Sequence, residues 1–295
     1  MEILILGSNG FLGSRLTEYI IENSNYTIHT FSRSKTFITN NDRVKHLQSS
    51  NYQRIFEEKI LNNIDIIIDL AGMDYKQAMD NPIESFKYNC IRSGELYNIS
   101  AQEKLKLFIF LSTVHIYKEY KGIVPNENST ILPINAYSAS KVSAEYLLGE
   151  LYKKHKIPLN ILRLANICGY NKGTNKSTSK LLINDICRSI KDGVEVNIRS
   201  DRKTKLNVFP CRSFCKEIKS LIDCKSDNDL IIKNINADES ITIEEIIDLC
   251  YESYSLYCEE NIKKESRKIN NSEWNKLSYK DKILWEIGMI FKSYE

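Results

Sequence analysis

The first 170 residues alternate between short apolar runs and longer amphipathic stretches. The apolar runs predict strands of a sheet, and they cover residues 2–7, 26–31, 43–48, 64–72, 105–113 and 159–166. The stretches between them repeat apolar residues at helical spacing and predict helices over 10–23, 52–63, 81–104 and 136–155. Because several runs are continuously apolar, their strands are expected to be buried on both faces. The pattern therefore predicts an α/β fold with a doubly wound parallel sheet.

After residue 168 this alternation weakens. A polar loop is expected first, then a helix over 181–193 that a glycine closes, and then a strand, loop and helix over 234–252 with Thr242 as the helix cap. The last stretch, 274–295, is predicted to be helical. We expect a small α+β lobe here, and a segment near 205–235 that returns to the sheet.

Composition narrows the class of protein. The 295 residues include 41 basic and 38 acidic side chains, and no basic run suggests a nucleic-acid partner. The start lacks a secretory signal and no long apolar stretch occurs, so we expect a cytoplasmic protein with no membrane partner. The eight cysteines are scattered without a CxxC pair, which predicts reduced thiols and no metal site.

The glycine-rich segment 7–13, GSNGFLG, lies between the first strand and its helix. Gly7 permits a tight turn, Gly10 lets the backbone approach a pyrophosphate, and Gly13 lets the helix pack on the sheet. The free N–H groups of the helix N-terminus favour an anion. The alternative is a purely structural turn. No lysine followed by Ser or Thr closes the loop, so a P-loop NTPase is excluded.

A tyrosine four residues before a lysine is the second candidate for chemistry. This spacing occurs three times, at Tyr117 with Lys121, Tyr137 with Lys141 and Tyr152 with Lys156. Only Tyr137 opens an amphipathic helix after a buried strand that ends in hydroxyl residues, the last of them Thr113. Positions i and i+4 of a helix share a face, so Tyr137 and Lys141 are predicted to point into one cleft. We interpret Tyr117 as a loop residue in solvent.

A tyrosine and a lysine in this arrangement suit proton transfer. A free phenol has a pKa of about 10 and is a poor acid–base group near neutrality. A cation nearby favours the phenolate and lowers that pKa. Tyr137 is therefore predicted to exchange a proton with a substrate oxygen. The alternative is a surface Tyr and Lys on one helix face.

The order of five motifs resembles the extended short-chain dehydrogenase/reductases, the family of nucleotide-sugar epimerases, dehydratases and ketoreductases. The motifs are ILILGSNGFLGSRL, IDIIIDLAG, LSTVHIY, YSASKVSAE and LRLANICG. The resemblance implies a Rossmann-type dinucleotide-binding domain over 1–168 and a mainly substrate-binding lobe over 169–295. It also implies a possible homodimer. The chain is most similar to members encoded with bacterial surface-polysaccharide genes.

The same resemblance implies roles for individual residues. Thr113, Tyr137 and Lys141 form the catalytic set, in which Lys141 also holds the nicotinamide ribose and Thr113 orients the substrate oxygen. The expected cofactor-binding residues are Gly7, Asn9, Gly10, Phe11, Leu12, Gly13, Ser32, Arg33, Ser50, Asn51, Leu70, Ala71, Gly72, Asn89, Leu164 and Ile167. The expected substrate-binding residues are Met73, Val114, His115, Asn166 and Arg202. The alternative for Arg202 is a cluster of charged side chains in solvent. The alternative for His115 is a histidine whose hydrogen bonds are satisfied beneath its loop. Ser213 stands where the family has an aspartate, so the chain departs from the family pattern at this substrate contact.

The end of the second strand bears on the cofactor. A carboxylate at this position hydrogen-bonds to the adenosine ribose of NAD, whereas an arginine accommodates the 2′-phosphate of NADP. The chain has Ser32, Arg33 and Lys35 and no carboxylate nearby, which predicts NADP(H) over NAD(H). The alternative is a solvated Arg33 and a pocket that accepts NAD through backbone contacts.

The residues after Thr113 bear on the reaction. Sugar-nucleotide dehydratases have Asp and Glu there, but this chain has Val114 and His115, so dehydration is not expected. With NADPH, the sequence predicts a ketoreductase acting on a nucleotide-linked 4-keto-6-deoxy sugar. An epimerase with bound NAD is the first alternative, and a non-catalytic NAD(P)-binding regulator is the second.

Overall fold

A seven-stranded parallel sheet forms the centre of the protein. The computed structural model describes residues 1–33, 41–57, 59–118, 120, 124–171, 181–224, 229–263 and 269–294. The strands are β1 (Glu2–Leu6), β2 (Thr27–Ser32), β3 (Val44–Gln48), β4 (Ile66–Asp69), β5 (Leu107–Thr113), β6 (Leu159–Leu164) and β10 (Leu230–Ile235). Their order is β10-β6-β5-β4-β1-β2-β3, and every neighbouring pair is parallel. The predicted fold class is confirmed.

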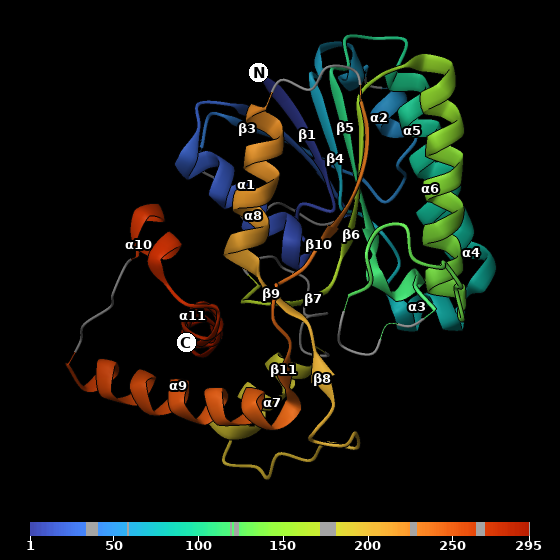
Figure 1. The fold of residues 1–295 in the computed structure, drawn as a ribbon. Coiled ribbons are helices and arrows are strands. Elements are labelled where there is room, and N and C mark those ends of the chain that lie inside the picture. Colours follow the sequence, from blue (N-terminus) through green and yellow to red (C-terminus); the bar gives the residue numbers. More distant parts are fainter. Residues whose placement is uncertain are drawn as a thin grey trace.

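Helices cover both faces of the sheet (Figure 1). On one face, α1 (Phe11–Asn23) and α8 (Cys211–Asp223) bury Leu16 and Phe214 against the strands. On the other, α5 (Arg92–Ser100) and α6 (Ala136–His155) bury Tyr97 and Leu148. The central strands β1, β4 and β5 are apolar at most positions because both of their faces are covered, and the carboxyl ends of the parallel strands all lie at one edge of the sheet.

The C-terminal part of the chain forms a second core below that edge in Figure 1. Its helices are α7 (Leu182–Lys191), α9 (Ile243–Lys263), α10 (Asn271–Lys276) and α11 (Tyr279–Lys292). Two small sheets accompany them, one of β7 (Asn166–Cys168) with β9 (Val208–Pro210) and one of β8 (Lys205–Leu206) with β11 (Ile241–Thr242). Strand β10 returns to the main sheet beside β6. The domain boundary expected near residue 168 stays a prediction.

Two predicted helices are interrupted. The helix expected over 52–63 is a short α2 (Arg54–Glu57) and a 3₁₀ turn η1 (Ile60–Asn63), because Lys59 takes a left-handed backbone with φ of 51°. The helix expected over 81–104 consists of α4 (Pro82–Phe86), a π-helical turn η2 (Lys87–Ile91) and α5. Periodicity in the sequence does not report such insertions, since the apolar face continues through them. Two further short elements are α3 (Tyr75–Asp80) and η3 (Val114–Ile116).

The cysteines are free thiols, as predicted, and six of the eight are buried. Among the residues that the structure describes, no group of His, Cys, Asp or Glu is arranged to hold a metal ion. Within the same residues, no helix combines the length and the apolarity that a membrane span requires.

A buried carboxylate joins the sheet to the C-terminal core. Glu286 of α11 is fully buried, and its Oε1 accepts a hydrogen bond from the backbone N–H of Arg212 at the start of α8 (2.6 Å). Burial raises the pKa of Glu286 to about 7, and the charges of Arg15 and Arg212 offset only part of this effect. The native state therefore binds a proton that the unfolded chain releases near pH 4.5.

This difference predicts a pH-dependent stability. Since the folded pKa of Glu286 lies above its unfolded value, its contribution favours folding at low pH and is lost as the pH rises from about 4.5 to about 7. At about 1.4 kcal/mol for each pKa unit, the wild type should lose on the order of 3 kcal/mol of its free energy of unfolding over this pH range. Glu286→Gln has no carboxyl group at this position, so its free energy of unfolding should not show this decrease. Urea unfolding of both proteins at pH 5 and pH 8 measures this. An equal change in both proteins would contradict the assignment.

Candidate active site

The glycine turn connects β1 to α1 and leaves little room for side chains. Gly7 has a φ of +76°, which other residues rarely adopt. A Cβ on Gly13 would lie 2.2 Å from the carbonyl oxygen of Gly7. Helix α1 begins after Gly10, and no side chain caps it. Its first N–H groups are therefore placed to bind an anion, as the sequence predicts.

A cavity of about 640 Å³ opens beside this turn, and we call it the glycine-turn cavity. Its lining residues are Gly7, Asn9, Gly10, Phe31, Ser32, Arg33, Leu70, Ala71, Gly72, Met73, Gln77 and Tyr88. They come from the carboxyl ends of β1, β2 and β4 and from the helices that follow. A tight glycine turn, an uncapped helix end and an elongated wall of strand ends fit a dinucleotide.

A second cavity of about 470 Å³ adjoins the first, and we call it the tyrosine cavity. Leu70, Gly72 and Met73 line both cavities. The predicted catalytic residues Thr113, Tyr137 and Lys141 all line the tyrosine cavity. Its other lining residues are Leu12, Asp74, Leu111, Ser112, His115, Leu164, Ala165, Asn166, Ile167, Leu181, Leu182, Ile183, Leu206 and Val208.

Local structure brings the three catalytic candidates together. Thr113 is the last residue of β5, and Asn135 caps α6 by accepting a hydrogen bond from Ser138 N (2.9 Å). Tyr137 and Lys141 then lie one turn apart on the helix and face the end of the strand. The Lys141 ammonium donates a hydrogen bond to the carbonyl oxygen of Leu111 (2.8 Å), also in β5.

The other two tyrosines with this spacing lie elsewhere. Tyr117 is buried, and its hydroxyl bonds to Arg163 and Asn234 (both 2.8 Å), so the interpretation as a loop residue in solvent was wrong. It belongs to a buried network in which Glu145 of α6 pairs with Arg163 of β6 (2.7 Å). Lys121 lies outside the described residues. Tyr152 lies in the last turn of α6, and Lys156 is the residue that follows the helix.

Burial dominates the electrostatics of the catalytic pair. It lowers the pKa of Lys141 to about 8, with Asp69 and Glu145 acting in the opposite direction. It raises the pKa of Tyr137 above the ordinary 10, and the hydrogen bond with Thr113 offsets only part of this rise. The expectation that Lys141 lowers the phenol pKa is therefore wrong for this structure. The Lys141 ammonium is directed to the Leu111 carbonyl instead.

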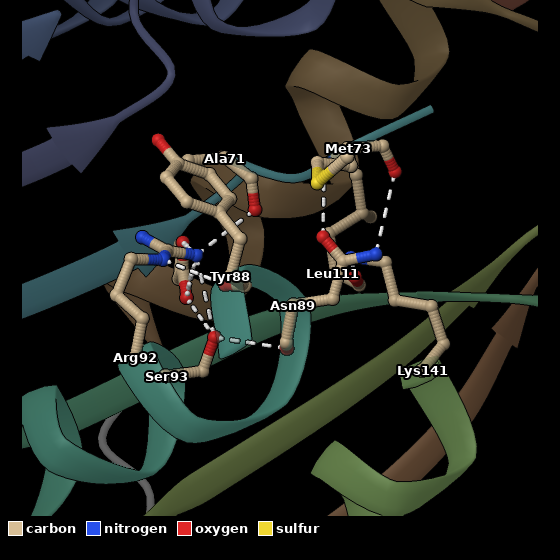
Figure 2. A network of polar contacts seen from close by, with 9 residues as sticks. Ala71, Met73, Tyr88, Asn89, Arg92, Ser93, Leu111 and Lys141 are labelled. Atoms are coloured by element: carbon tan, nitrogen blue, oxygen red, sulfur yellow. Dashed lines mark hydrogen bonds and ion pairs between the residues drawn. The ribbon is translucent and has the colours of Figure 1, made fainter. Parts of the chain in front are cut away.

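Asn89 lies behind the cavities and holds a loop that lines them (Figure 2). Its Oδ1 accepts from Met73 N (2.7 Å), and its Nδ2 donates to Ser140 Oγ of α6 (3.0 Å). Asn89 belongs to the π-helical turn η2. It thus fixes the loop after β4 relative to the catalytic helix, and it does not itself line either cavity.

The predicted substrate residues divide into two groups. Met73, His115 and Asn166 line the tyrosine cavity. Asn166 Nδ2 donates to the Tyr120 hydroxyl (2.7 Å), and His115 packs edge-on against the Tyr120 ring. His115 is exposed, although the protein packed around it lowers the pKa of its imidazole.

The other predicted residues do not line the cavity expected for them. Val114 is fully buried, and Arg202 is exposed on a turn outside the cavity walls. Ser50 and Asn51 are exposed after β3 and line neither cavity. Phe11 and Gly13 support the turn from within α1, and Leu164 and Ile167 line the tyrosine cavity rather than the glycine-turn cavity. Lys35 lies outside the described residues.

Some lining residues were not predicted. They are Phe31, Asp74, Gln77, Tyr88, Leu111, Ser112, Ala165, Leu181, Leu182, Ile183, Leu206 and Val208. The apolar ones carry no signal that separates a cavity wall from a core. Asp74 does carry one, because it follows the buried strand β4 and opens α3 with a capping box.

The family model described as "NAD dependent epimerase/dehydratase family" matches residues 3–206, more than half of the chain. The chain belongs to this family. The family is of the extended short-chain dehydrogenase/reductase type, an oxidoreductase-type class of enzymes, so the resemblance drawn from the sequence is confirmed.

Curated relatives in the family have different activities. The chain is 31% identical over 206 residues to a dTDP-D-glucose 4,6-dehydratase of Dictyostelium discoideum, a match that covers 61% of the chain and 47% of the relative. It is 26% identical over 191 residues to a D-erythronate dehydrogenase of Haemophilus influenzae, covering 62% of the chain and 60% of the relative. The chain therefore spans about half to three fifths of these relatives.

Solved structures share the fold over the whole chain. A UDP-glucuronic acid 4-epimerase of Bacillus cereus, in complex with UDP-glucuronic acid and NAD, superposes with a TM-score of 0.78 at 20% identity and covers 100% of both chains. A UDP-N-acetylglucosamine 4-epimerase of Methanobrevibacter ruminantium M1 has a TM-score of 0.77 at 18% identity, covering 99% of this chain and 97% of that chain. At these identities the likeness establishes the fold.

The predicted preference for NADP(H) is contradicted. Three structures of the Bacillus cereus epimerase that match this family member contain NAD. Arg33 lines the glycine-turn cavity, but an arginine after the second strand is weak evidence by itself. A solvated arginine is compatible with NAD when backbone groups hold the adenosine ribose, which is the alternative given above.

Proposed function

We propose that this family member transfers a hydride between NAD and a nucleotide-linked sugar, and that it acts as an epimerase. One observation carries the proposal: Thr113, Tyr137 and Lys141 line one cavity, and that cavity adjoins the one beside the glycine turn. A sugar in the tyrosine cavity would then lie next to a dinucleotide in the glycine-turn cavity.

The glycine-turn cavity supplies the groups that a dinucleotide needs. The N–H groups at the start of α1 would bind the pyrophosphate, and Gly7 and Gly10 let it approach the backbone. Ser32 and Arg33 lie where an adenosine ribose would be held. Bound NAD would accept a hydride from the sugar carbon or return it.

Side chains of the tyrosine cavity would carry the proton. Tyr137 would take a proton from the sugar hydroxyl as the carbon is oxidised, and return it when the carbonyl is reduced. Thr113 would orient that oxygen by hydrogen bonding. Lys141, whose ammonium donates to the carbonyl oxygen of Leu111 at the end of β5 (2.8 Å), would hold the nicotinamide ribose of the bound dinucleotide.

The lining of the tyrosine cavity supports an epimerase over a dehydratase. Among the similar proteins, two structural neighbours are 4-epimerases of UDP-sugars and one relative is a dTDP-D-glucose 4,6-dehydratase, so the choice between the reactions depends on the cavity. Dehydration needs an additional acid and base at the sugar. Val114 is buried away from the cavity, and among the described lining residues Asp74 is the one carboxylate.

A second candidate is a ketoreductase acting on a nucleotide-linked 4-keto-6-deoxy sugar, with NADH as reductant. It is favoured by the apolar wall that Leu181, Ile183, Leu206 and Val208 form on the C-terminal side of the tyrosine cavity. A methyl group would be buried there at no cost, whereas a carboxylate would lose its hydration. A role in surface-polysaccharide synthesis belongs to this candidate.

A panel of nucleotide-linked sugars tests the proposal. We expect one UDP- or dTDP-hexose to be converted to its 4-epimer in the presence of NAD, with no net change in absorbance at the NADH maximum. Chromatography of the sugar nucleotides measures the conversion. Net NADH consumption with a 4-keto-6-deoxy sugar would instead support the ketoreductase. NAD binding without turnover of any sugar would favour a non-catalytic regulator and contradict both.

A further inference from the structure

A buried ion pair lies next to two residues of the glycine-turn cavity wall, and Figure 2 shows one of its members, Arg92, beside Ala71 and Tyr88. Asp69 ends β4 and Arg92 opens α5, and the two side chains are 0% and 1% exposed. Arg92 Nη2 lies 2.9 and 3.0 Å from the two carboxylate oxygens of Asp69. Ser93 Oγ donates a further hydrogen bond to Asp69 (2.7 Å). The carboxylate is thus held by two neighbouring residues of one helix.

Arg92 also contacts two residues of the cavity wall. Its Nη2 donates to the carbonyl oxygen of Ala71 (3.0 Å), and its Nε donates to the carbonyl oxygen of Tyr88 (2.9 Å). The guanidinium carbon lies 4.7 Å from the centroid of the Tyr88 ring. Both Ala71 and Tyr88 line the glycine-turn cavity. One side chain therefore fixes the wall at two points that are separated in the sequence.

Stability alone does not account for this arrangement. Taking two charges out of water costs about as much as their attraction returns, so a well-packed apolar pair would hold the helix to the sheet equally well. An apolar pair would not supply the planar fork of N–H donors that reaches the Asp69 carboxylate and both carbonyl oxygens. The guanidinium thus fixes the positions of these carbonyl oxygens, which apolar packing cannot do.

We propose that Arg92 is a positioning residue for the cofactor site. With Asp69 as its counter-ion, it holds the Ala71 carbonyl and the Tyr88 ring in the positions that a bound NAD contacts. The inference rests on the proposed function, because it takes NAD as the ligand of the glycine-turn cavity.

Three variants separate positioning from charge balance. Arg92→Gln replaces the guanidinium, which donates from both Nε and Nη2, by a shorter amide with one N–H₂ group, and it leaves Asp69 as a buried, unpaired charge. The double variant Asp69→Asn with Arg92→Gln removes both charges and keeps side chains of similar size. Ser93→Ala is the matched control, because Ser93 contacts Asp69 and lines neither cavity. For each protein, thermal melting reports stability, and isothermal titration with NAD reports affinity without any turnover.

We expect Arg92→Gln to lower the melting temperature by several degrees and to weaken NAD binding about tenfold or more. The double variant should recover most of the melting temperature but remain about tenfold weaker toward NAD. Ser93→Ala should lose stability and keep its affinity. If Arg92→Gln does not fold, the NAD affinity of the double variant still tests the positioning role. Recovery of wild-type NAD affinity in the double variant would overturn the positioning role but not the proposed function. Absence of NAD binding by the unchanged protein would overturn the proposed function as well.

Discussion

Replacing Tyr137 by phenylalanine is expected to reduce turnover about 10²- to 10⁴-fold, the range that a positioned acid–base group contributes. The variant loses only the hydroxyl, which hydrogen-bonds with Thr113, and keeps the ring in the tyrosine cavity. NAD affinity should change little, because Tyr137 lines the tyrosine cavity and not the glycine-turn cavity. Steady-state rates with the sugar nucleotide that the wild type converts, together with NAD titration, measure both effects.

Tyr152→Phe is the matched control for this experiment. Tyr152 has the same spacing to a lysine, but it lies near the end of α6 and lines neither cavity. Its removal should leave the rate within about twofold of the wild type, as expected for a substitution away from the site. Equal rates for Tyr137→Phe and the wild type would remove Tyr137 from the proposed mechanism. Equal losses in both variants would show that a general defect, and not the missing proton carrier, is responsible.

Replacing Gly13 by alanine is expected to abolish tight NAD binding and to destabilise the fold. The added Cβ would lie 2.2 Å from the Gly7 carbonyl oxygen and 2.7 Å from Ser8 Cα, and these backbone atoms have to move. A displacement of about 1 Å in a positioning group can cost about 10²-fold, and forcing a methyl group into a packed site costs about 1–3 kcal/mol. Chemical denaturation and NAD titration measure the two effects.

Gly149 supplies the comparison for Gly13. It lies inside α6, where an added Cβ would meet no atom within 4 Å. Gly149→Ala should therefore stabilise the protein by about 0.5–1 kcal/mol, because alanine loses less backbone entropy in a helix, and NAD binding should be unchanged. If Gly13→Ala also proved neutral, the close approach of α1 to the glycine turn would not be needed for the cofactor site.

Local patterns in the sequence predicted the strands of the sheet, the glycine turn and the helix face that Tyr137 and Lys141 share. Continuous apolar runs required strands covered on both faces, and Gly7 and Gly13 sit where any side chain would strain or collide with the turn. Tyr137 and Lys141 share a helix face through their spacing alone. Each of these features depends on residues that are near in the chain, so periodicity and residue type suffice to predict them.

Tertiary structure alone decided what surrounds the catalytic set. The pairing of Asp69 with Arg92, the π-helical turn that holds Asn89, and the apolar wall of the tyrosine cavity all join segments that are far apart in the sequence. Arg202 lies outside the cavity although its charge suggested a diphosphate contact, and Arg33 gave the wrong cofactor. A side chain's charge is visible in the sequence. Its neighbours are set by how helices and strands pack, and those neighbours determine burial, pKa and ligand contact.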